Sequence, residues 1–69
     1  MQYNKFNVTI FIKSVIFTDT EVIIDYVENE IRSDEGRFIC PKVDYEEALK
    51  LFKEERQQYY NKVDIVDNR

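Results

Sequence analysis

The residue types that carry most enzyme chemistry are scarce in this chain of 69 residues. It contains no histidine, so it lacks the usual general base at neutral pH and any Ser–His or Cys–His nucleophile pair. Ser14 and Cys40 therefore have no catalytic partner in view, and Cys40 is expected to be a small buried side chain. Carboxylates are the only groups left for acid–base work, and the sequence predicts that the protein is not an enzyme.

Metal and cofactor sites are not expected either. Transition-metal sites need histidine or several cysteines, and the chain has one cysteine. Asp34–Glu35 and Asp64 with Asp67 are pairs of carboxylates, but no segment has the alternating ligands and closing Glu of a calcium loop. A single glycine cannot build a phosphate-binding loop. The sequence therefore predicts no cofactor and no metal.

The first of two candidate protein-binding surfaces contains Arg56, Tyr59 and Tyr60. These residues lie near the end of a helix predicted for residues 44–63. Tyr and Arg are enriched at interface hot spots because they combine a large contact area with a polar end. The alternative is that Tyr59 and Tyr60 complete the apolar stripe of a small core.

The second candidate surface is acidic. Residues 19–36 carry seven acidic groups against Arg32 alone, within a chain whose net charge is −4. If this segment is helical, Asp25 and Glu28 lie on one side of it and could contact a basic partner, including a nucleic-acid-binding protein. The alternative is an ordinary solvated face. Direct nucleic-acid binding is not expected, because it needs clustered Lys and Arg.

The element that must position the first surface is an amphipathic helix from Asp44 to Val63. Asp44 and Glu47 have the spacing of a capping box, and Pro41 ends the segment before it. One face of the helix is apolar, with Phe52 near its middle. Arg56 projects from that face, so its stem must lie along the core or its guanidinium must reach a partner.

Residues 18–33 can be interpreted in two ways. Thr18 and Glu21 have the form of a second capping box, and a helical stripe contains Ile23, Ile24 and Val27. The β-branched run from Val22 to Ile24 favours a strand instead. We expect a helix here, with the strand as the alternative.

The remaining segments are predicted as strands and a turn. Residues 3–17 alternate apolar and polar side chains, with an interruption at Lys13–Ser14 that indicates a bulge or a new direction. Gly36 is expected in a turn with Asp34 and Glu35, and residues 37–43 in a short strand that Pro41 limits to an edge or an exit. Residues 64–69 are either a terminal strand or a frayed tail.

The predicted fold is one small α+β domain, residues 1–69, in the order strand, helix, strand, helix, with the C-terminal helix packed on a short sheet. The alternative is a three-stranded antiparallel sheet plus one C-terminal helix. No apolar run is long enough to span a membrane and no signal peptide is recognisable, so a cytoplasmic protein is expected.

Two functions are compatible with these features. The first is a small acidic protein-binding module that modulates or inhibits a larger partner, as the stand-alone inhibitors encoded by phages and other mobile elements do. The second is a structural or assembly protein that forms a homodimer through its C-terminal helix.

Overall fold

Four strands and one helix make up the computed structural model, which describes residues 7–29, 35–67 and 69. In chain order the elements are β1 (Asn7–Phe17), β2 (Glu21–Glu28), β3 (Glu35–Pro41), α1 (Tyr45–Arg56) and β4 (Lys62–Asp67). They form a small compact α+β domain, with a single helix in the described residues where the sequence predicted two.

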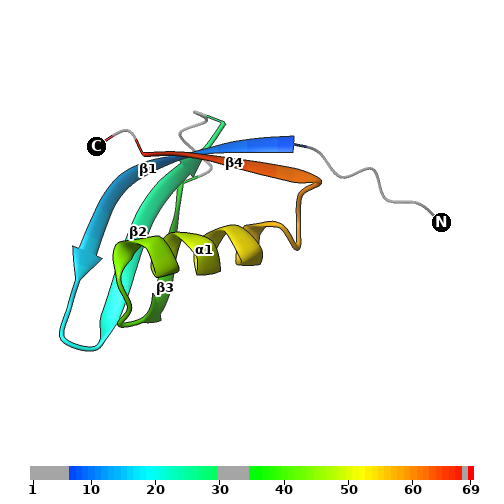
Figure 1. The fold of residues 1–69 in the computed structure, drawn as a ribbon. Coiled ribbons are helices and arrows are strands. Elements are labelled where there is room, and N and C mark those ends of the chain that lie inside the picture. Colours follow the sequence, from blue (N-terminus) through cyan, green and yellow to red (C-terminus); the bar gives the residue numbers. More distant parts are fainter. Residues whose placement is uncertain (1–6, 30–34, 68) are drawn as a thin grey trace.

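The sheet has the strand order β3-β2-β1-β4. The first three strands form an antiparallel meander, and β4 then pairs parallel with β1. A parallel pair needs a crossover connection, and α1 provides it by running along one face of the sheet between the two edge strands (Figure 1). The arrangement is that of the alternative prediction, with β4 added as a fourth strand.

The helix predicted for residues 18–33 is wrong over Glu21–Glu28, which form β2; residues 30–33 lie outside the described part. The capping-box signal had another cause. The Thr18 hydroxyl oxygen accepts a hydrogen bond from the Glu21 amide at 2.9 Å, as an N-cap would, but it does so in the β1–β2 turn. The Thr18 amide also donates to the Glu21 carbonyl at 2.9 Å, which closes a hairpin.

The interruption at Lys13–Ser14 is a bulge within one strand. The pairing of β1 with β2 passes from Ile12↔Tyr26 to Ser14↔Asp25, so Lys13 is the extra residue. The bulge changes which side chains of β1 face α1: Val8, Ile10 and Ile12 do so before it, and Val15 after it.

Phe52 lies at the centre of the core between α1 and the sheet and is fully buried. Its ring centroid is 4.8 Å from that of Tyr26 and 5.1 Å from that of Phe38, both in tilted contacts. The prediction that Phe52 anchors the apolar face of the helix is confirmed. The other buried core residues come from all four strands and the helix: Val8, Ile10, Ile12, Val22, Ile24, Tyr26, Cys40, Ala48 and Val63.

The helix begins as predicted but ends earlier. The Asp44 carboxylate accepts a hydrogen bond from the Glu47 amide at 2.9 Å, so one of the two bonds of the capping box is present. The last helical residue is Arg56, because Val63 pairs with Val8 in the sheet instead of continuing the helix.

Gly36 does not form the predicted turn; it lies in β3, opposite Tyr26. A Cβ at this position would be 2.5 Å from the Tyr26 ring and hydroxyl, so the glycine provides space for the ring. Among the described residues, positive φ is found at Asn29, at 53°.

Candidate functional site

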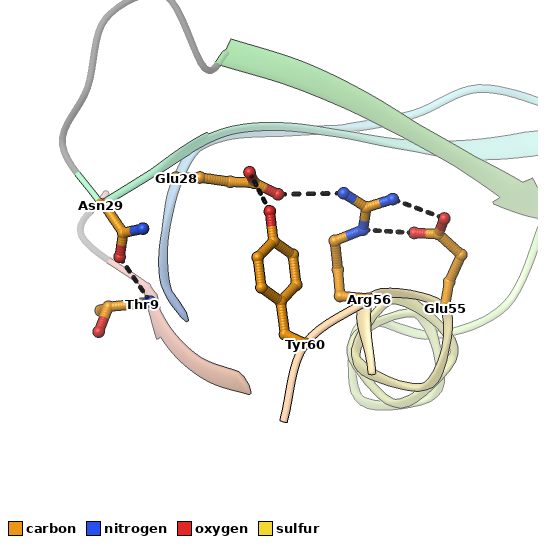
Figure 2. Close-up of polar contacts among 6 residues, drawn as sticks. All are labelled: Thr9, Glu28, Asn29, Glu55, Arg56 and Tyr60. Atoms are coloured by element: carbon orange, nitrogen blue, oxygen red, sulfur yellow. Dashed lines mark hydrogen bonds and ion pairs between the residues drawn. The ribbon is translucent and has the colours of Figure 1, made fainter. Parts of the chain in front are cut away.

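A polar cluster of four side chains lies where the C-terminal end of α1 meets the end of β2 (Figure 2). The Glu28 carboxylate accepts a hydrogen bond from Arg56 Nη1 at 3.0 Å and another from the Tyr60 hydroxyl at 2.7 Å. Glu55 binds the same guanidinium through two bonds of 2.7 Å. We call Glu28, Glu55, Arg56 and Tyr60 the polar cluster.

The end of β2 and the end of α1 position the side chains of this cluster. Glu28 is the last residue of β2 and lies opposite Ile10 on the helix-facing side of the sheet. Just after it, the Thr9 backbone amide donates to Asn29 Oδ1 at 3.0 Å (Figure 2). The Asn29 backbone amide donates to the Thr9 carbonyl at 2.8 Å, so two hydrogen bonds fix the strand end. Arg56 is the last residue of α1, and Tyr60 follows the turn after it.

Burial makes the ion pair of the cluster more than a surface contact. The side chains of Glu28 and Arg56 are only 13% and 17% exposed. The hydrogen bonds that Arg56 donates to Glu55, and then the one it donates to Glu28, hold its pKa above its already high usual value, so this guanidinium is a permanent cation. The cluster can therefore hold a charge and two side chains in place.

The fixed guanidinium lies against two aromatic rings. Arg56 Cζ is 5.8 Å from the centroid of the buried Tyr26 ring and 5.0 Å from that of Tyr59. Tyr59 itself is 59% exposed, more than any other large hydrophobic side chain in the described residues. The result is an exposed aromatic ring that rests on an anchored cation.

Asp25 lies on the other face of the sheet, apart from the cluster. Its carboxylate accepts hydrogen bonds from Arg37 Nε at 2.8 Å and from the Ser14 hydroxyl at 3.2 Å. The hydrogen bond from Arg37 holds the pKa of Asp25 below its usual value. Nearby, Lys13 Nζ and Glu35 Oε1 are 3.2 Å apart, and the two ion pairs line a shallow pocket of about 360 Å³.

The predicted site residues thus fall into two places. Glu28, Arg56 and Tyr60 come together in the polar cluster and Tyr59 stacks on it, whereas Asp25 does not join them. The expectation that Asp25 and Glu28 share one side of a helix is wrong, because strand residues three apart point to opposite faces of a sheet. Whether these residues bind a partner stays a prediction.

Sequence reasoning missed the apolar side chains on the sheet face that points away from α1, which we call the open face. They come from all four strands: Phe11, Ile16, Ile23, Val27, Ile39 and Val66. Ile16 and Ile39 are 45% and 50% exposed. The sequence did contain a sign of this face: in β1 and β2, apolar residues occur at both odd and even positions. This hides the alternation typical of a strand and indicates a strand with two apolar faces.

The described residues hold no group of three or more carboxylate or cysteine side chains that could bind a metal ion. Cys40 is buried, and burial raises the pKa of its thiol. No helix in the described residues is both long and apolar enough to cross a membrane.

Comparisons with protein-family models, with curated proteins and with solved structures found no significant match to this chain. Its function must therefore be inferred from its own geometry.

Proposed function

We propose that this chain is a non-catalytic protein-binding module that modulates a larger partner, and that Tyr59 is its anchor in the partner. The observation that carries the proposal is the combination of exposure and order at Tyr59. Its ring is 59% exposed, yet it stacks at 5.0 Å on a guanidinium that three hydrogen bonds to carboxylates hold in place.

An ordered aromatic ring is well suited to binding. Association normally costs about 0.5–1.5 kcal/mol for each rotamer-rich side chain that it immobilises, and a ring already held by its own protein avoids part of that cost. The partly buried ion pair between Glu28 and Arg56 supports the proposal, because it fixes the cation on which the ring rests. Tyr60 belongs to the same support through its bond to Glu28.

The expected partner presents an apolar pocket that can accept a tyrosine ring, on a surface that is basic overall. The basic character follows from the net charge of −4, which steers oppositely charged proteins towards the chain. Exposed glutamates on α1, including Glu54, lie on the same element as the anchor.

The test compares two exposed aromatic residues. Tyr59→Ala removes the anchor, and Phe17→Ala is the matched control, because Phe17 is also exposed and also lies under a cation, Lys42, at 5.8 Å. The β1–β2 turn that follows Phe17 and the C-terminal end of α1 are at opposite ends of the molecule (Figure 1).

The immobilised proteins are used to capture binders from extract of the native cell. We expect at least one protein to be retained by the wild type and by Phe17→Ala and lost with Tyr59→Ala, while urea denaturation shows both variants folded. If every captured protein is retained equally by Tyr59→Ala, Tyr59 is not the anchor and the proposal fails.

Dimerisation through the helix, the alternative function, finds less support in the geometry. The exposed residues of α1 are all charged: Glu46, Glu47, Lys50, Lys53 and Glu54. Two such surfaces offer each other little apolar area to bury.

A further inference from the structure

The open face of the sheet has a layered pattern that the strand register reveals. One row of apolar side chains crosses three strands through Ile39, Ile23 and Ile16. A second row crosses through Val27, Phe11 and Val66. Between the rows, Asp25 forms an ion pair with Arg37 and accepts a hydrogen bond from Ser14. Lys13, at the bulge, forms an ion pair with Glu35, which continues the second row on β3.

The open face is more apolar than a solvent-exposed sheet face usually is. The sheet buries its other face under α1, and the described segments leave the open face to solvent. In an antiparallel sheet with one solvated face, that face normally carries polar residues at nearly every position. The exposed Ile16 and Ile39, with the partly exposed Ile23 between them, therefore indicate an interaction surface.

The charges on the face indicate what covers it. Its central groups are two cations and two carboxylates, all within the chain's own ion pairs, so the patch has no net charge to attract a strongly basic or acidic surface. In a two-fold contact, if residue i of one copy touches residue j of the other, then residue j of the first copy touches residue i of the second. A face with balanced charges can therefore meet itself without placing like charges together.

The dimensions also suit such a contact. Four strands about 4.8 Å apart and about seven residues long at 3.3 Å per residue give a patch of about 19 by 23 Å. Two such patches in contact bury about 900 Å² in projection, which is less than the roughly 1,200–2,000 Å² of stable interfaces and falls in the range of weak, reversible ones.

We propose that the open face is the contact surface of a homodimer, in which the sheets of two copies pack face to face about 10 Å apart with the helices outside. This proposal is independent of the one for Tyr59: the anchor lies beside α1 in the outer layer, so a dimer displays two anchors. The modest area predicts a dimer of micromolar rather than nanomolar affinity.

Sedimentation equilibrium of the purified chain tests the proposal. We expect a reversible dimer with twice the 8.4 kDa mass of one chain. Ile39→Asp places a carboxylate in the contact in both copies and should raise the dissociation constant about tenfold or more. Lys50→Ala changes the net charge by the same amount on the outer surface of α1 and should leave dimerisation unchanged.

A second variant provides the test if Ile39→Asp does not fold. The double substitution Ile16→Thr and Ile39→Thr keeps β-branched residues in both strands while it removes apolar contact area, and it should weaken the dimer less than Ile39→Asp. A wild-type chain that remains monomeric up to about 1 mM would overturn the proposal. So would a dimer that tolerates the threonine variant but is weakened by Lys50→Ala.

Discussion

Glu28 is the residue on which the polar cluster depends, and its replacement has a magnitude that follows from the contacts. Glu28→Ala removes the acceptor of two hydrogen bonds, one from Arg56 and one from Tyr60. Breaking a fully buried ion pair by removing one partner costs about 3–5 kcal/mol, because the other charge is left uncompensated. Here Arg56 keeps both bonds to Glu55, so its charge stays paired.

The larger loss is therefore expected at Tyr60, whose hydroxyl donates a hydrogen bond to the charged Glu28 carboxylate; such a bond contributes about 1.5–3 kcal/mol. Together with the weakened ion pair, we expect Glu28→Ala to lower the free energy of unfolding by about 2–3 kcal/mol. That is a large fraction of the roughly 3–10 kcal/mol typical of a domain of 69 residues.

Glu28→Gln is the informative companion variant. It keeps the size and one acceptor oxygen but removes the charge, and it should cost about 1 kcal/mol. Both values come from urea denaturation at neutral pH, fitted with a common slope. A double-mutant cycle with Arg56→Met should give a coupling of about 1 kcal/mol or more. The reasoning is refuted if Glu28→Ala costs less than about 0.5 kcal/mol, because the cluster would then hold nothing in place.

Three further predictions test the fold around the site. Phe52→Ala removes a fully buried ring between two aromatic neighbours and should cost about 3–5 kcal/mol, so loss of the native circular dichroism at room temperature is expected. Gly36→Ala places a Cβ 2.5 Å from the Tyr26 ring and should lower the denaturation midpoint; an unchanged midpoint would mean that Tyr26 moves freely. Arg37 stabilises the ionised form of Asp25 in the folded protein. The contribution of Asp25 to the free energy of unfolding is therefore fully present above the usual pKa of 3.8 and is lost as the pH falls through its lower folded pKa. The stability advantage of the wild type over Asp25→Asn should therefore be constant above about pH 5 and shrink below about pH 4, and an advantage that grows with acid would contradict the ion pair.

The sequence predicted best where one side of a segment is apolar and the other polar. The start of β1, where Val8 and Ile10 alternate with Asn7 and Thr9, and the capped start of α1 both show that pattern, and both were found where they were expected. β2 was mistaken for a helix because it is an inner strand with apolar residues on both faces, which removes the alternation. Thr18 then gave a false start signal, because its hydroxyl makes the same bond in a hairpin turn as it would at a helix N-terminus.

The candidate site was predictable in part for the same reason. Arg56 in an apolar stripe required a partner, and this requirement is met by Glu28 and Glu55. Glu28 could not be predicted as that partner, because it faces α1 only when β2 is a strand, which places Glu28 and Asp25 on opposite faces of the sheet. The end of α1 was not predictable, because no glycine or proline follows Arg56 and Val63 continues the helical spacing although it pairs in the sheet.

The most direct test of the central claim is the affinity of a captured partner for three purified proteins: the wild type, Tyr59→Ala and the control Phe17→Ala. A hot-spot residue is worth about 2 kcal/mol or more, so Tyr59→Ala should weaken binding about 30-fold or more, mainly through faster dissociation. Phe17→Ala should leave the affinity within about twofold of the wild type. Equal affinities for the wild type and folded Tyr59→Ala would contradict the claim that the chain binds its partner through this ring.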